Sequence, residues 1–106
     1  HGARFAALGD MLELGEAGPG LHADLGTLAA KLGIDRVYGY GPLSRNTVEA
    51  AGAGGIPDAR AFDTHEGIAA AVHDAAQPGD VLLVKGSRGM RMETVIQELK
   101  RIVETY

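Results

Sequence analysis

The stretch VLLVKGSRGM, residues 81–90, decides the fold of this chain. Its four leading apolar residues follow a turn signal, Pro78-Gly79-Asp80, and predict a short buried strand. The strand runs straight into Lys85-Gly86-Ser87-Arg88, which brings two cations, a glycine and a hydroxyl to its end. A buried strand that ends in such a loop is typical of an α/β domain whose ligand site lies at the strand ends.

The residues after this loop predict the clearest helix of the chain. Charged residues at positions 91, 93, 98, 100, 101 and 104 fall on one side of it. Apolar residues recur at helical spacing on the other side, at Met92, Val95, Ile96, Leu99, Ile102, Val103 and Tyr106. This helix is therefore expected to pack an apolar stripe against the rest of the domain.

Three further strands are predicted upstream, each short and closed by turn residues. They fall at residues 5–8, 36–40 and 60–62. The first, Phe5-Ala6-Ala7-Leu8, is wholly apolar and is therefore expected to be buried on both faces of a sheet.

Three helices are predicted between these strands. The first covers residues 21–32, with Gly33 as its stop, and the second begins at a Ser44 cap. The third begins with Asp63 followed three residues later by Glu66, which is the spacing of a capping box. Its apolar stripe consists of Ile68, Val72, Ala75 and Ala76.

Strands and helices thus alternate along the whole chain. This order predicts a Rossmann-like, three-layer α/β/α domain around a mainly parallel sheet of about four strands. By analogy with the first half of a doubly wound fold, the expected strand order is 3-2-1-4. The first and fourth strands are then neighbours at the point where the winding reverses, and ligands of open α/β sheets bind beyond the strand ends at that point.

Composition narrows the possible functions. A length of 106 residues allows one small domain, and 45% hydrophobic residues supply a core for it. A net charge of −4 argues against a nucleic-acid partner, and no apolar run is long enough for a membrane span. The chain has no cysteine, which excludes disulfides, thiolate metal ligands and cysteine catalysis. Its histidines, His1, His22, His65 and His73, match no zinc signature, and His22 is expected at the surface or in a cap.

The loop at residues 85–88 has the chemistry of an anion site. Arg88 can bind a carboxylate or phosphate through two parallel hydrogen bonds, and Gly86 and Gly89 allow a close backbone approach. The helix that follows would add unpaired backbone amides. An equally supported alternative is that Ser87 merely caps this helix while both cations are solvated. The loop is not a P-loop, because the chain contains no GxxxxGK[ST] motif.

The loop after the first strand brings Asp10, Met11 and Glu13 to the same end of the sheet. The two carboxylates could accept hydrogen bonds from an amine or bind a cation. The residues alone favour a simpler interpretation, in which Asp10 is a turn residue and Met11 packs over the sheet edge. Two carboxylates without further ligands predict no metal site, and no arrangement of side chains predicts a catalytic residue.

Two long segments carry a family resemblance. LGDMLELG at residues 8–15, with Leu21-His22 beyond it, and LLVKGSRGMRMETV at residues 82–95 resemble the C-terminal domain of the Mur ligases, as does GIDRVYGYG at residues 33–41. The resemblance covers residues 3–106, which we expect to be excised from a longer chain, and leaves His1-Gly2 as a candidate tag remnant. Gly18-Pro19-Gly20 departs from the family pattern and predicts a late start for the first helix.

The resemblance implies a cytoplasmic role in the synthesis of the peptidoglycan precursor. In the branch of the family that it favours, ATP phosphorylates the terminal carboxylate of UDP-N-acetylmuramoyl-tripeptide. The amine of D-alanyl-D-alanine then attacks the acyl phosphate. ATP and magnesium are held mainly by a central domain that this chain lacks, so residues 3–106 alone are expected to be inactive and to bind no cofactor tightly.

The resemblance also implies roles for single residues. Arg88 and Ser87, together with the helix amides, would hold the carboxylate of the dipeptide, and Lys85 would add positive potential. Asp10, Met11 and Glu13 are weaker candidates for the ammonium or nucleotide side. The residues themselves leave two alternatives open, an independent α/β module that binds a small anion or nucleotide and a purely structural domain.

Overall fold

The computed structural model describes residues 2–105, so His1 and Tyr106, with their predicted roles in a tag and in the last apolar stripe, lie outside the described residues. The elements, in chain order, are β1 (Arg4–Gly9), η1 (Gly15–Ala17), α1 (Gly18–Lys31), β2 (Arg36–Tyr40), α2 (Ser44–Ala53), β3 (Asp58–Phe62), α3 (His65–Ala75), β4 (Val81–Lys85), η2 (Arg88–Met90) and α4 (Glu93–Thr105), where η marks a 3₁₀ turn.

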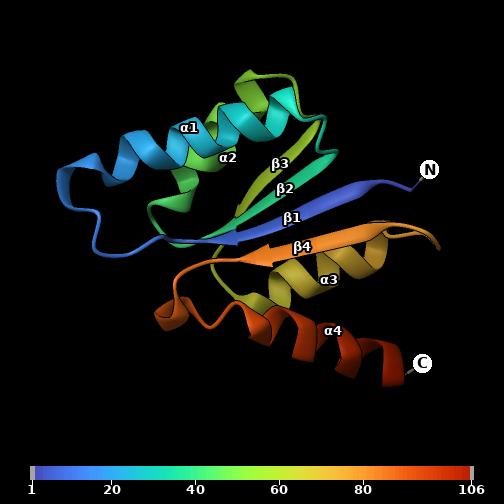
Figure 1. The fold of residues 1–106 in the computed structure, drawn as a ribbon. Helices are drawn as coiled ribbons and strands as arrows, with labels where there is room; N and C mark the ends of the chain where they lie inside the picture. The colour runs from blue at the N-terminus through green and yellow to red at the C-terminus, as the bar shows by residue number, and fades with distance from the viewer. Residues whose placement is uncertain (1, 106) are drawn as a thin grey trace.

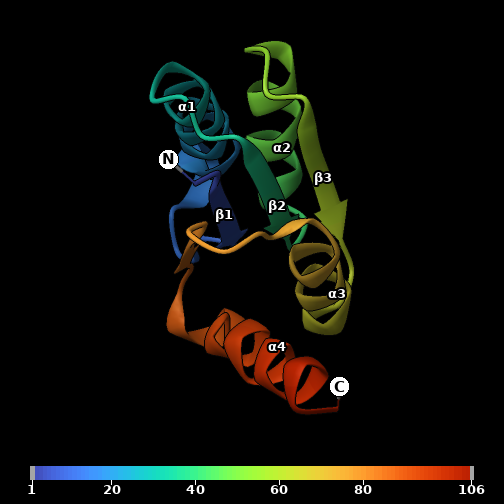
Figure 2. The same cartoon turned by 90° about the vertical axis from the view of Figure 1, so that its right-hand side faces the viewer.

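The four strands form one parallel sheet in the order β3-β2-β1-β4. Helices α1 and α2 cover one face, and α3 and α4 cover the other (Figure 1). The view turned by 90° separates the three layers (Figure 2). The predicted α/β/α architecture and strand order are therefore confirmed, and β1 and β4 are neighbours with Leu8 opposite Lys85.

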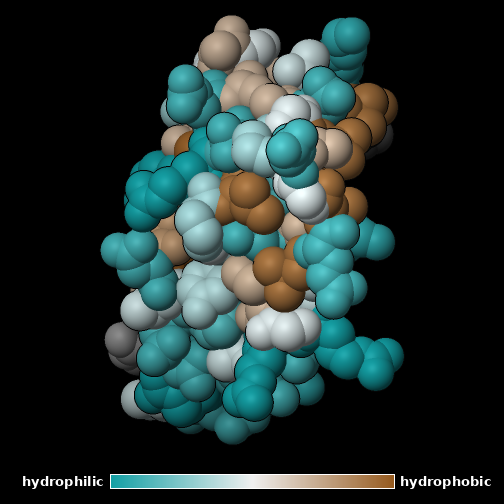
Figure 3. Space-filling model, turned by 90° about the vertical axis from the view of Figure 1, so that its left-hand side faces the viewer, coloured by the Kyte–Doolittle hydropathy of each residue, from teal (hydrophilic) through white to brown (hydrophobic). Residues whose placement is uncertain are grey.

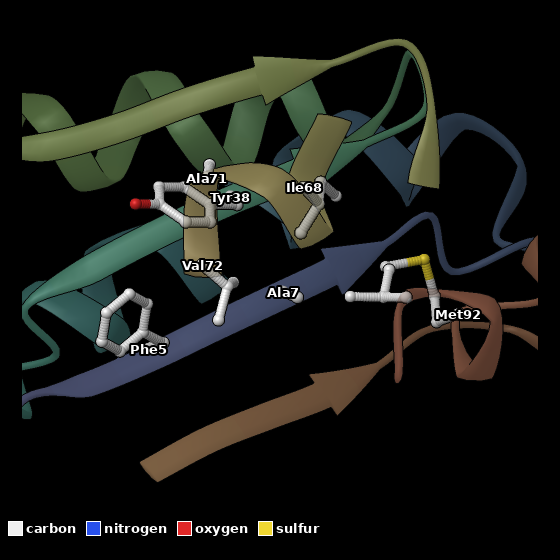
Figure 4. Close-up of a cluster of buried hydrophobic side chains, with 8 residues drawn as sticks. Phe5, Ala7, Tyr38, Ile68, Ala71, Val72 and Met92 are labelled. Carbon is white, nitrogen blue, oxygen red and sulfur yellow. The ribbon is translucent and has the colours of Figure 1, made fainter. Parts of the chain in front are cut away.

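The core is divided by the sheet into two apolar clusters. Alternate residues of β1 supply both, with Phe5 and Ala7 facing α3 and α4 while Ala6 and Leu8 face α1 and α2. Figure 4 shows the first cluster, in which Phe5 and Tyr38 from the sheet lie opposite side chains of α3. All four of these β1 residues are buried, as predicted from their unbroken apolar run.

Helix α1 approaches α2 most closely through small residues. Its buried positions are Gly18, His22, Gly26 and Ala29. A Cβ placed on Gly26 would lie 2.1 Å from the carbonyl oxygen of Thr47, so the two helix backbones approach closely. Of the leucines that follow helical spacing in α1, Leu21 and Leu28 are 43% and 49% exposed, whereas Leu25 is partly buried against the core cluster on this face of the sheet. Helical spacing predicted the helix, but which face is buried depends on the neighbouring helix.

The helix ends differ from the predictions in three places. Helix α1 begins at Gly18 instead of late, because a proline is tolerated in the first turn of a helix. Ser44 is the first residue of α2 and its hydroxyl caps nothing; the hydroxyl is buried and has no hydrogen-bond partner among residues 2–105. Helix α3 is capped by Thr64, whose Oγ1 accepts from the Gly67 amide at 2.9 Å, and not by Asp63.

The last helix buries less of its stripe than its periodicity predicts. Met92 and Val95 are buried, but Ile96 and Val103 are 42% and 57% exposed. Helix α4 packs mainly against α3 rather than against the sheet, so only a narrow strip of its apolar surface is covered.

One ionic cluster joins β2 to β3 at the amino ends of the strands. Asp58 accepts hydrogen bonds from Arg36, from the Tyr38 hydroxyl at 2.6 Å and from Arg60 Nε at 2.7 Å. Burial raises the pKa of the Asp58 carboxyl. The hydrogen bonds lower this pKa by more than burial raises it, so that it lies at about 2 instead of 3.8.

Asp58 is therefore expected to make folding depend on pH. A carboxyl with a depressed pKa stabilises the fold above its unfolded value, near 3.8, and this contribution is lost as the pH falls towards 2. We expect Asp58→Asn to lower the free energy of unfolding by about 1 kcal/mol at pH 7, because the pairs are partly solvated, and by less below pH 4. Urea unfolding at several pH values measures this, with Glu49→Gln on the exposed side of α2 as the charge control. A deficit that stays constant from pH 7 to pH 2 would contradict the assignment.

Candidate functional site

The loops that follow the four strands meet at the carboxyl edge of the sheet. Figure 3 views this edge directly and shows a mostly hydrophilic surface with small apolar patches near its middle. Three of these loops, after β1, β2 and β4, are tied to one another by hydrogen bonds. Hydrogen bonds thus connect three loops that are distant in sequence into one site.

Asp10 is the centre of this network. Its side chain accepts hydrogen bonds from the backbone amides of Leu43, at 3.1 Å, and Ser44, at 2.7 Å, and so caps α2 from another loop. Its carbonyl oxygen accepts from the Ser87 amide at 3.0 Å. Gly41 has a φ of +107°, and a Cβ there would lie 2.5 Å from the carboxylate.

The resemblance made Asp10 a weak candidate for ligand binding, whereas the structure shows its carboxylate buried and bonded to backbone amides. The residue is only 2% exposed and both carboxylate oxygens are engaged by backbone amides. The carboxylate therefore supports the site and does not face it. Met11 is half-buried and Glu13 is exposed with a φ of +65°, so their predicted roles stay predictions.

His22 is a second support, and the prediction of a surface or capping position for it is wrong. Its side chain is 1% exposed. The Met11 amide donates to Nε2 at 3.0 Å, which leaves the ring proton on Nδ1 to donate to the Gly18 carbonyl at 2.7 Å. The ring thus holds the loop after β1 against α1. The sequence placed His22 near the start of the first helix, and that position does not distinguish a buried ring from an exposed one.

The loop at residues 85–88 lies beside this network. The Ser87 hydroxyl accepts from the Leu12 amide at 2.7 Å, which fixes it to the loop after β1. The backbone of Gly86 packs closely against β1, because a Cβ on Gly86 would be 3.0 Å from the Gly9 Cα atom. The missing side chain therefore allows a close approach between two strands. Lys85 and Arg88 are exposed, as an anion site requires.

A 3₁₀ turn separates this loop from the last helix, which the sequence placed directly after it. Turn η2 covers Arg88–Met90, and α4 begins only at Glu93. The amides of Thr94 and Val95 donate to the carbonyls of Arg91 and Met92. The predicted contribution of helix amides to an anion site at Ser87 and Arg88 therefore finds no support in this arrangement.

Two cavities border this loop, and a third reaches turn η2 at Met90. One of about 630 Å³ is mostly apolar and includes Met11, Leu83, Lys85 and Ser87 in its wall, together with leucines of α1. One of about 200 Å³ lies on the other side of β4, where Arg88 contributes. The third, of about 340 Å³, is lined by Tyr40, Gly41, Pro42, Arg45, Phe62, Asp63 and Met90.

Within residues 2–105, no three His, Asp or Glu side chains come together as ligands for a metal ion. No helix in this part of the chain combines the length and the apolar character needed to cross a bilayer.

The sequence of the chain matches a known protein family. Residues 2–88 match the family model described as the glutamate ligase domain of the Mur ligases. The chain belongs to the Mur ligase family. The match ends within the loop at residues 85–88, so it includes β1 to β4 and the network around Asp10.

Individual Mur ligases are similar over nearly the whole chain. The UDP-N-acetylmuramoyl-tripeptide–D-alanyl-D-alanine ligase of Bacillus subtilis (strain 168) is 35% identical over 100 residues, which are 93% of this chain and 22% of that protein. The ligase of the same name from Escherichia coli (strain K12) is 36% identical over 100 residues, or 93% of this chain and 21% of that protein. The chain thus spans about a fifth of the length of the curated relatives it matches.

Solved Mur ligase structures have the same fold. A MurF ligase from Thermotoga maritima, in complex with ADP, superposes with a TM-score of 0.79 at 29% identity over 99% of this chain and 23% of that chain. MurF from Acinetobacter baumannii gives a TM-score of 0.76 at 29% identity, over 95% of this chain and 23% of that chain.

Proposed function

We propose that residues 3–106 are the acceptor-binding domain of a longer cytoplasmic ligase that joins D-alanyl-D-alanine to UDP-N-acetylmuramoyl-tripeptide. The observation that carries this proposal is that relatives of that name are 34–36% identical over more than 90% of the chain. The family membership supports it, and so does the position of residues 85–88 beside β1, where the winding of the sheet reverses.

The reaction requires three substrates, of which this domain would hold one. ATP phosphorylates the tripeptide carboxylate, and the amine of the dipeptide then displaces phosphate to form the new amide. The domain carries no P-loop, and residues 2–105 gather no three carboxylates or histidines, so ATP and Mg²⁺ would be held mainly by other domains. A relative crystallised with ADP supports the use of a nucleotide.

Within this domain, we assign the dipeptide carboxylate to Arg88. Its exposed guanidinium can form two parallel charge-assisted bonds with a carboxylate, and Lys85 adds positive potential at the other end of the loop. Ser87 already accepts from the Leu12 amide, and its own hydroxyl proton remains to donate to the ligand. Fixing the carboxylate would leave the amine of the dipeptide in reach of the acyl phosphate, and such positioning is a large part of catalysis.

Phosphate release by the full-length enzyme tests the proposal. The enzyme is supplied with ATP, Mg²⁺ and UDP-N-acetylmuramoyl-tripeptide, and with D-alanyl-D-alanine, single amino acids or neither. We expect release only with the dipeptide. Equal phosphate release with and without the dipeptide would contradict the proposal and favour the alternative of a module that binds a small anion.

Arg88→Ala in the same enzyme tests the residue assignment. Loss of a charge-assisted bidentate contact costs about 2 kcal/mol, which is about a 30-fold rise in the KM for the dipeptide. The KM for ATP should change by less than twofold. Arg101→Ala on α4, whose side chain pairs with Glu98, is the matched control for removal of an arginine. Wild-type kinetics in Arg88→Ala would refute the assignment.

A further inference from the structure

His65 connects three segments of the carboxyl edge. It is the first residue of α3, its Nε2 lies 2.8 Å from the carbonyl oxygen of Met90, and its ring lies against that of Tyr40 with centroids 4.2 Å apart. Met90 is the last residue of η2, and Tyr40 is the last residue of β2. The imidazole therefore joins turn η2, after β4, to the start of α3 and to the end of β2.

The chemistry of this contact fixes the donor. A carbonyl oxygen only accepts hydrogen bonds, so His65 must carry its proton on Nε2 to make a bond of 2.8 Å. Both the Nε2–H tautomer and the imidazolium carry that proton. The hydrogen bond is thus compatible with either charge state of the ring.

Turn η2 depends on such outside contacts. Arg91, which follows it, has a φ of +51°, a left-handed conformation that is unfavourable for a residue with a side chain. Inside the turn, only the Met90 and Arg91 amides donate back to the Ser87 and Arg88 carbonyls. A short strained turn keeps one conformation when its surroundings determine it.

Arg88 lies between two of these outside contacts. Ahead of it, the Ser87 hydroxyl accepts from the Leu12 amide at 2.7 Å, and behind it the Met90 carbonyl accepts from His65. The first contact comes from the α1 side of the sheet and the second from the α3 side. The direction in which Arg88 leaves the backbone is set by both.

We propose that His65 is a positioning residue for the acceptor substrate. Its bond to the Met90 carbonyl holds η2 so that Arg88 presents its guanidinium to the dipeptide carboxylate. This inference rests on the proposed function and adds to it a residue from α3 that does not itself touch the ligand. Because small displacements of a binding group weaken substrate positioning strongly, loss of the bond acts on the dipeptide and not on ATP.

The test uses His65→Leu, His65→Gln and the control His73→Leu, which lies on the same helix, in the full-length enzyme. We expect His65→Leu to raise the dipeptide KM about tenfold, as loss of one positioning hydrogen bond does, with the KM values for ATP and UDP-tripeptide within twofold. His65→Gln keeps a side-chain donor and should restore the dipeptide KM to within about threefold. His73→Leu should match the wild type.

A double-mutant cycle separates positioning from a general structural role. If His65 acts through Arg88, then His65→Leu has no further effect on the dipeptide KM once Arg88 is alanine. Multiplicative effects of the two changes, an unchanged KM in His65→Leu, or an equal rise in all three KM values would each overturn the proposal. If dipeptide-dependent phosphate release is absent from the wild type, the proposed function fails and this inference with it. If the wild type shows dipeptide-dependent phosphate release and His65→Leu has the same dipeptide KM, only the positioning role of His65 is rejected and the proposed function stands.

Discussion

Replacing Gly26 with alanine is expected to lower the free energy of unfolding by about 3 kcal/mol, even though alanine is the better helix former. The added Cβ would lie 2.1 Å from the Thr47 carbonyl oxygen and 2.9 Å from the Ala51 amide nitrogen. Both obstacles are backbone atoms of α2, so no side-chain rotation relieves the overlap and the two helices must separate. The gain in helix propensity, about 1 kcal/mol, offsets only part of this cost.

Gly20→Ala is the matched control, because Gly20 is in the same helix and a Cβ added there would meet open space outside its own helix. This change should leave stability equal or raise it by up to about 1 kcal/mol. Urea denaturation of both variants, followed by far-UV circular dichroism, measures the difference. Equal midpoints for the two variants would mean that α1 and α2 can move apart without loss.

Asp10→Ala is expected to cost a similar amount, about 3 kcal/mol, for an electrostatic reason. The change removes two hydrogen bonds from backbone amides to a carboxylate and leaves the Leu43 and Ser44 amides, one of them fully buried, without an acceptor. It also takes a negative charge from the amino end of α2, where the helix dipole favours one. Glu13→Ala, an exposed carboxyl three residues later, controls for charge and should change stability by less than about 0.5 kcal/mol.

The two Asp10 substitutions, to alanine and to asparagine, distinguish capping from simple packing. Asparagine preserves volume but offers one acceptor in place of two, so Asp10→Asn should retain only part of the stability. Thermal unfolding of Asp10→Ala and Asp10→Asn beside the wild type provides the comparison. A fully stable asparagine variant would show that the amide network does not require the charge.

The fold was predictable because its signals are local. The strands β1 and β4 are short apolar runs closed by turns, and the alternation of strands with helices leaves few topologies that obey right-handed crossover. Burial within the helices was not predictable in the same way. The leucines of α1 satisfy helical spacing, yet Leu21 and Leu28 are exposed, whereas Gly26 is buried because a residue without a side chain allows the close approach of α2.

The site was predictable in its place but not in its contacts. The loops after β1 and β4 had to meet once the strand order was known. That Asp10 caps α2 could not be read from the sequence, because Asp10 and Ser44 are far apart along the chain and Ser44 is itself a good capping residue. The sequence predicted a helix start at residues 63–66, which includes His65, but the bond of His65 to Met90 depends on how α3 packs against η2.

The network around Asp10 has a consequence for engineering and for the divergence of related sequences. Loops that share hydrogen bonds with one carboxylate and one serine have matched lengths, so an inserted residue in any of them displaces the others. We expect the carboxyl edge to accept side-chain replacements but to reject insertions. The Gly54-Gly55 turn at the opposite edge, where Gly55 has no neighbour within 4 Å of a Cβ position, is where added length is accommodated. Changes of acceptor specificity in this scaffold would then arise by substitution on a backbone of constant length.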